Sequence, residues 1–148
     1  MTAAEWQTSG DPRAMIGWLA AQGDTEPLWQ FAIRCCRRIW GDLPGDAFRQ
    51  VVAHAERVGT RDIDNELAAV SRSLERLERQ FRSATDDDEQ TRLSRQIAFG
   101  RMVLAFEHQD GAGAAESISR DLLAWAEDPD AERRTQADLL RQLVPDPS

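Results

Sequence analysis

The feature that most constrains the fold is a run of apolar residues spaced alternately four and three positions apart. Its members are Ile63, Leu67, Val70, Leu74, Leu77 and Phe81. This spacing places all six side chains on one face of an α-helix, and the a/d pattern lasts for nearly three heptads. Because such a seam needs an apolar partner, the pattern predicts a helix over about 60–83 that packs against another helix.

A second amphipathic stretch follows after a short polar connection. The acidic TDDDE at 85–89 is typical of a turn and a helix start, since carboxylates stabilise the N-terminal end of a helix. Apolar residues then recur on a wide stripe up to about residue 109. Two long amphipathic helices with a short connection form an antiparallel pair, so we expect a helical hairpin over about 60–109.

The rest of the chain divides into shorter helices at glycine and proline residues. TAAE at 2–5 has the spacing of a capping box, GAGA at 111–114 is expected to form a loop, and Pro129 is expected to separate the last two helices. These helices are predicted around residue 6 and over 11–23, 24–42, 45–59, 116–128 and 130–144. No segment alternates as a β-strand does. The sequence therefore predicts a single all-α domain over 1–148, a compact bundle of six or seven helices.

Composition agrees with one globular domain and excludes several functions. The chain has 148 residues, of which 41% are hydrophobic and 30% are charged. Its net charge of −8 opposes non-specific binding to nucleic acid and to anionic membranes. All 18 basic residues are arginine. Without lysine the chain cannot form a Schiff base or supply a P-loop or kinase lysine.

The sequence also indicates a cytoplasmic protein without membrane association. The N-terminal stretch lacks the basic and apolar regions of a signal peptide. The longest nearly apolar run, at 14–21, is too short to cross a bilayer. The only two cysteines are adjacent and cannot build a disulfide framework.

The block RCCRRIW at 34–40 combines two thiols with three arginines. On a helical wheel Cys35 and Cys36 fall inside a wide apolar arc, so we expect both to be small buried core residues. Adjacent helical residues diverge by 100° and lack the spacing of a metal-binding C-x-x-C pair. A redox role would require exposed thiols near positive charge. The thiols are therefore interpreted as structural.

Six arginines remain as candidates for an interaction surface. Arg34, Arg37 and Arg38 fall outside the apolar arc of the same helix. One interpretation is a solvated face with acidic partners on neighbouring helices. The other is a patch that recognises an acidic partner or a phosphate backbone, because guanidinium groups bind both bidentately. A nucleic-acid surface could also include Arg72, Arg76 and Arg79.

Other possible sites have simpler interpretations. His54 and His108 are the only imidazoles and have no partners at a catalytic or metal-ligand spacing. The acids at 86–89 lack the EF-hand pattern, and GAGAAE at 111–116 departs from the dinucleotide fingerprint and follows a helix. We therefore expect no enzyme: no catalytic residues, no cofactor and no metal site.

Four segments resemble an uncharacterised bacterial family of the planctomycete type. They are MTAAEWQTSGDPRAMIGWL at the start, the CCRRIW block, VVAHAERVG, and QADLLRQL near the end. The resemblance covers roughly the first 60 residues and the last dozen. The middle hairpin and the final VPDPS depart from the family pattern. The resemblance implies a relationship and no mechanism.

These observations favour a small non-enzymatic helical module that binds another protein or itself. The hairpin over 60–109 is the expected contact surface, since a partly exposed seam can bury against a partner helix. The alternative is a small helical subunit or regulator of a nucleic-acid-associated complex that uses the arginines.

Overall fold

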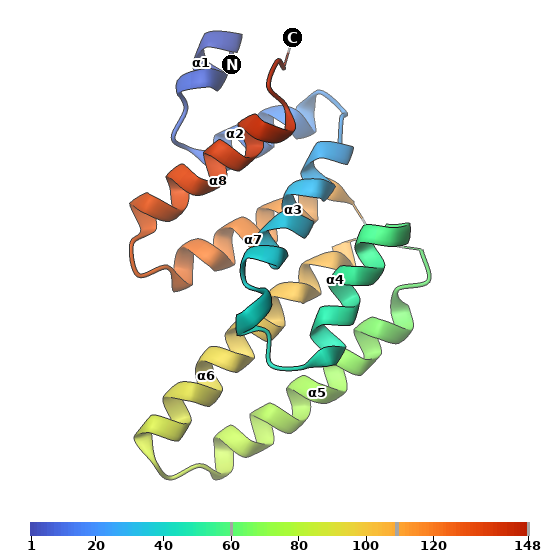
Figure 1. Cartoon of the computed structure of the whole chain (residues 1–148), viewed down its shortest axis with the longest axis vertical. Helices are drawn as coiled ribbons and strands as arrows, with labels where there is room; N and C mark the ends of the chain where they lie inside the picture. The colour runs from blue at the N-terminus through green and yellow to red at the C-terminus, as the bar shows by residue number, and fades with distance from the viewer. Residues whose placement is uncertain (60, 109, 148) are drawn as a thin grey trace. The chain divides into compact units, whose positions relative to one another are not determined.

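A computed structural model describes residues 1–59, 61–108 and 110–147. These residues form eight α-helices and two short 3₁₀-helices, and no β-strand occurs among them (Figure 1). The helices are α1 (Ala3–Thr8), α2 (Pro12–Ala21), α3 (Glu26–Arg38), α4 (Asp46–Val58), α5 (Asp64–Ser83), α6 (Asp87–Met102), α7 (Gly111–Trp125) and α8 (Pro129–Leu143). The 3₁₀-helices are η1 (Trp40–Asp42) and η2 (Val103–His108). The predicted all-α class is confirmed, and the described residues contain eight α-helices where six or seven were predicted.

Local capping signals explain where several helices begin. Thr2 accepts from the Glu5 amide at 3.1 Å, and the Glu5 carboxylate accepts from the Thr2 amide at 2.7 Å, which completes the predicted capping box. Asp11 and Asp128 cap α2 and α8 with proline at the next position. Proline suits this position because its missing N–H would have no intrahelical acceptor there.

The prediction of a loop over GAGA at 111–114 is wrong. These residues form the first turn of α7, and the Asp110 carboxylate accepts from the Gly113 amide at 2.6 Å. Gly111 is required by packing: a Cβ there would lie 2.2 Å from the carbonyl oxygen of Thr25. Glycine allows the start of α7 to approach the first turn of α3 closely.

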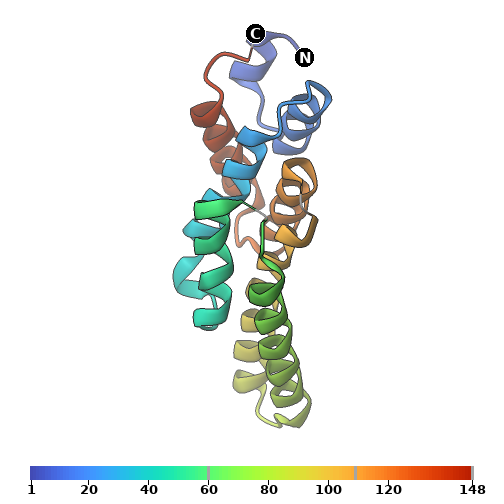
Figure 2. The same cartoon turned by 90° about the vertical axis from the view of Figure 1, so that its right-hand side faces the viewer.

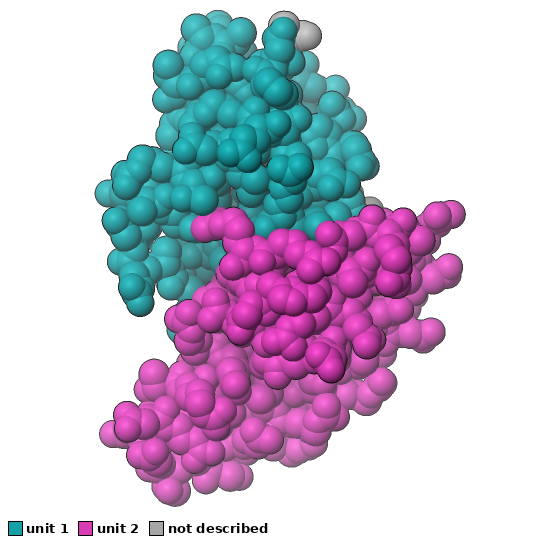
Figure 3. Space-filling model, viewed as in Figure 1, with its two compact units in different colours: residues 1–35, 108–148 teal, residues 36–107 magenta. Residues whose placement is uncertain are grey.

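The fold groups the chain into two compact units, coloured separately in Figure 3. Unit 1 contains Met1–Cys35 and His108–Ser148, and unit 2 contains Cys36–Glu107. Unit 2 is thus one continuous segment, whereas unit 1 is built from both ends of the chain. The expectation of a single domain over 1–148 stays a prediction.

Unit 1 is organised by α2, α7 and α8, which contact one another. A buried polar contact joins α7 to α8, where the Ser119 hydroxyl donates to Oε1 of Gln136 at 2.5 Å. Trp6 is fully buried, and its indole N–H donates to the carbonyl of Val144 at 2.9 Å. Buried apolar side chains of the three helices form the core: Met15, Ile16, Leu19, Ala114, Ala115, Ile118, Leu122, Ala137 and Leu140.

Unit 2 is built from α4, α5 and α6. Helices α5 and α6 form the predicted hairpin, and α4 lies beside it (Figures 1 and 2). Helix α4 contacts α6 through Phe48. The Phe48 ring lies over Gly100, where a Cβ would approach Cε1 to 2.7 Å. The predicted helix to residue 109 is wrong in its last part, because α6 ends at Met102 and η2 follows.

The predicted seam is buried over only part of its length. Ile63, Leu67, Val70 and Leu74 are buried within unit 2, Leu77 is half-buried, and Phe81 is 38% exposed. The exposed end corresponds to the part of the hairpin that extends past the N-terminal end of α4 in both views (Figures 1 and 2). The seam therefore packs mainly inside the unit, and only its last turns remain available.

Cys35 and Cys36 are fully buried and form no disulfide, as predicted. A thiol-reactive reagent reaches buried cysteines only after the protein opens locally or unfolds globally. We expect the thiols of the native protein to react at least about 100-fold more slowly than those of the denaturant-unfolded protein. In the unfolded protein both cysteines should react. Stopped-flow labelling with a chromogenic disulfide measures both rates. Rapid labelling of either cysteine in the native protein would contradict the buried assignment.

Candidate protein-binding groove

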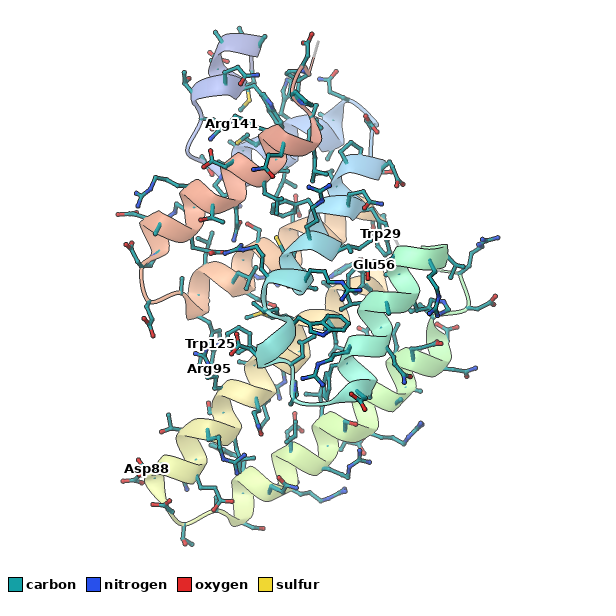
Figure 4. All side chains as sticks on the ribbon, in the orientation of Figure 1. Trp29, Glu56, Asp88, Arg95, Trp125 and Arg141 are labelled. Atoms are coloured by element: carbon teal, nitrogen blue, oxygen red, sulfur yellow. The ribbon has the colours of Figure 1, made fainter. Side chains whose placement is uncertain are left out.

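The arginines of the RCCRRIW block lie on the exposed side of α3. Arg37 forms an ion pair with Glu56 of α4, and its guanidinium stacks on the Trp40 ring at 3.9 Å from the centroid. Glu56 is labelled on α4 in Figure 4. For Arg37 the structure therefore supports a solvated face with an acidic partner on a neighbouring helix. Arg34 and Arg38 are exposed on the same helix.

Arg72, Arg76 and Arg79 form a second set, which we name the arginine stripe. They occupy positions i, i+4 and i+7 of α5, so they share one exposed face of that helix. Arg76 donates to the Ser73 hydroxyl at 2.9 Å. Arg72 and Arg79 make no hydrogen bond or ion pair with the described residues. The stripe thus presents guanidinium donors that an acidic partner could use.

A groove runs beside the arginine stripe, between the start of α4 and the second half of α5. Its volume is about 310 Å³. The half-buried Leu77 supplies apolar surface, and Arg76 and Gln80 supply polar groups on the α5 side. The complete lining is Pro44, Gly45, Asp46, Ala47, Phe48, Ser73, Arg76, Leu77 and Gln80.

The groove continues along α5 toward the tip of the hairpin. A second, shallower pocket shares Arg76 and Gln80 with the groove and adds Arg79 and Ser83. Both features result from unequal helix lengths. Helix α5 has 20 residues and α4 has 13, which corresponds to about 30 Å and about 20 Å at the usual rise. The last turns of α5 therefore lack a neighbour on the α4 side.

Two further arginines hold the wall of the groove in place. The Arg49 guanidinium donates to the carbonyls of Leu43 at 3.0 Å and Trp40 at 3.3 Å, and it pairs with Asp46 at 3.3 Å. From α6, Arg95 pairs with Asp42 at 3.4 Å. These bonds fix η1 and the turn before α4, so the groove is formed before any partner binds.

No family model, curated protein or solved structure matches the chain. The resemblance of its first 60 residues and its last dozen to a planctomycete-type bacterial family stays an expectation.

The lining residues Phe48, Leu77 and Gln80 were not singled out from the sequence as site residues. The apolar pattern assigns Phe48 and Leu77 to the core, and this is correct for the buried Phe48. A usable signal was nevertheless present in the predicted lengths. A helix over 45–59 cannot cover the whole of a helix over 60–83, so some of the longer seam had to remain open.

The two histidines lie apart from the groove lining. His54 is buried on α4, where Nε2 donates to the carbonyl of Arg61 at 2.5 Å and Nδ1 lies 3.3 Å from a Glu66 carboxylate oxygen. These contacts support the predicted structural role. His108 is exposed at the end of η2.

The described residues contain neither a cluster of metal-binding side chains nor a membrane-spanning helix. In that part of the chain no group of three or more His, Cys, Asp or Glu side chains is placed to hold a metal ion. Among the same residues, every helix is too short or too polar to traverse a bilayer.

Proposed function

We propose that this chain is a non-enzymatic helical module that acts by binding another protein, and that the groove beside α5 is the binding surface. The observation that carries the proposal is the overhang of α5 beyond α4. It leaves Leu77 only half-buried, in a preformed groove whose rim carries Arg76. Such a surface combines apolar contact area with charged groups that can select a partner.

The groove chemistry indicates an acidic partner with an apolar anchor. Exposed ion pairs contribute only about 0–1 kcal/mol each, so contact with the half-buried Leu77 would supply the apolar part of the affinity. Arg76 and Arg79 would determine orientation and discriminate against basic partners. An amphipathic helix with carboxylates beside its apolar face satisfies both requirements.

A titration with designed peptides tests this proposal. The probe is a synthetic amphipathic helix with leucine on one face and glutamate on the flanks. We expect amide chemical-shift changes in two-dimensional NMR spectra to concentrate in 44–48 and 73–83. Reversing the charge of Arg76 and Arg79 to glutamate should weaken binding at least tenfold, equivalent to about 1.4 kcal/mol, because each new carboxylate would repel the peptide.

Matched controls separate this site from non-specific adsorption. The same peptide with lysine in place of glutamate should not bind. The pair Arg92→Glu and Arg120→Glu makes the same change in net charge at two exposed positions away from the groove lining, and it should leave glutamate-peptide affinity within about twofold. Shifts that map to other surfaces, or binding that survives reversal at Arg76 and Arg79, would refute the groove as the site.

Nucleic-acid association is the alternative function, and the arginine stripe is the observation that favours it. Three exposed guanidinium groups on one helical face can contact successive phosphates. The charge of unit 2 argues against nucleic-acid binding, because the unit contains 12 arginines and 13 acidic residues and so has a net charge of −1. The alternative requires binding that weakens steeply with salt and with alanine at Arg72, Arg76 and Arg79. Absence of any shift in a low-salt gel assay would exclude it.

A further inference from the structure

One exposed aromatic residue in unit 1 has the chemistry that the groove requires. Trp125 is the last residue of α7 and is 41% exposed (Figure 4). Tryptophan is the residue type most enriched among the anchors of protein interfaces, because it buries a large rigid surface at little entropic cost. A solvent-facing tryptophan at a helix end is therefore a candidate for contact with another molecule.

The residues around Trp125 are strongly acidic. The segment from Asp121 to Glu132 contains five acidic residues and no arginine. It includes the turn between α7 and α8, where Asp128 caps α8 by accepting from the Ala131 amide at 3.1 Å. Because the cap and Pro129 restrict this turn, the tryptophan and its carboxylates are displayed on a structured element. We name residues 121–132 the acidic turn.

Charge is also divided unequally between the two units. Unit 1 carries 6 arginines and 13 acidic residues, a net charge of −7, whereas unit 2 carries a net charge of −1. The acidic turn belongs to unit 1, and the arginine stripe belongs to unit 2. The acidic turn of one copy is therefore complementary in charge to the arginine stripe of another copy.

We propose that the groove of one copy binds the acidic turn of a second copy, with Trp125 as the anchor. The indole packs on the half-buried Leu77, while Glu127 and Asp130 face Arg76 and Arg79. This inference rests on the proposed function, since it names a second copy as the partner that occupies the groove. The contact joins unlike surfaces, so it is heterologous, and repetition of it from copy to copy gives a ring or an open chain of copies.

The test measures self-association of the full chain by sedimentation velocity over a wide concentration range. The wild type should associate. Trp125→Ala should weaken association about 30-fold, as expected when an aromatic anchor is removed. Phe81→Ser is the matched control: Phe81 is exposed to a similar degree and shares the apolar face of α5 with Leu77, but it lines neither the groove nor the shallower pocket. It should associate as the wild type does.

Charge exchange identifies the two surfaces that meet. One variant carries Arg76→Glu and Arg79→Glu, and the other carries Glu127→Arg and Asp130→Arg. Each variant alone places like charges at the contact and should remain monomeric. An equimolar mixture places unlike charges at both contacts and should associate. Circular dichroism of each variant checks that the helices are retained.

The outcomes separate this inference from the function on which it rests. A mixture that stays monomeric while the wild type associates overturns the proposed contact, as does association that depends on Phe81 and not on Trp125. A wild-type chain that is monomeric at every concentration but binds the acidic peptide overturns the second copy as partner and leaves the proposed function standing. A wild-type chain that neither self-associates nor binds the acidic peptide overturns both proposals.

Discussion

Replacing Trp6 by alanine should destabilise the protein by about 3–5 kcal/mol, as expected when a fully buried tryptophan is truncated. The lost contacts include the Trp18 ring, whose centroid lies 5.6 Å away, and the hydrogen bond to the Val144 carbonyl. Helix α1 has six residues and is too short to be stable by itself. The variant should therefore also lose the structure of α1, and its thermal midpoint should fall by on the order of 10 °C.

Chemical denaturation and amide hydrogen exchange measure these two effects. Trp6→Phe serves as a control because it retains an aromatic ring but removes the indole donor. Its cost should be smaller, about 1–3 kcal/mol, since the Val144 carbonyl loses its partner. Slow exchange of the α1 amides in Trp6→Ala would show that this helix is held by other contacts and would contradict the assignment.

Gly111→Ala should cost about 3 kcal/mol, at the upper end of the range for overpacking. Its Cβ would lie 2.2 Å from the Thr25 carbonyl oxygen and 3.0 Å from the Trp29 amide nitrogen. Both atoms belong to backbone that forms the first hydrogen bond of α3. No side chain can rotate away to make room, so one of the two helices must move.

Gly17→Ala provides a matched control with the opposite expected sign. Gly17 lies on the exposed face of α2, and no atom would come within 4 Å of its Cβ. Alanine is favoured over glycine inside a helix by about 0.5–1 kcal/mol, so this variant should be more stable than the wild type. Urea unfolding of both variants and the wild type measures the change in the free energy of unfolding. Equal effects of the two substitutions would show that the contact at Gly111 does not constrain packing.

The pair of glycine positions also shows what sequence patterns can and cannot predict. Helices α1 and α2 were predictable from caps that lie within a few residues of the helix start, and α5 was predictable from its apolar spacing. Gly111 was misread as part of a loop because its role depends on Thr25, which is distant in sequence. A short window of sequence contains the propensity of glycine to interrupt a helix, but it does not contain the neighbour that makes glycine necessary.

The candidate site was only partly predictable for a related reason. The helical wheel correctly separated Cys35 and Cys36 from the exposed Arg37. Arg72, Arg76 and Arg79 were named only as further candidates, and the structure shows that they share one exposed face of α5. The groove could not be located in the same way, because it depends on where α4 stops along α5. The acid that pairs with Arg37 was also unidentified, since Glu56 lies on the next helix.

The interrupted course of unit 1 has a consequence for biogenesis. Its N-terminal part leaves the ribosome first but lacks α7 and α8, which complete its core, until the last third of the chain has been made. Unit 2 is continuous and needs only its own three helices, so we expect it to form first during translation. Trp6 and the other apolar residues near the N-terminus then remain exposed in the nascent chain. The N-terminal part of unit 1 is therefore the segment that a holding chaperone would be expected to protect.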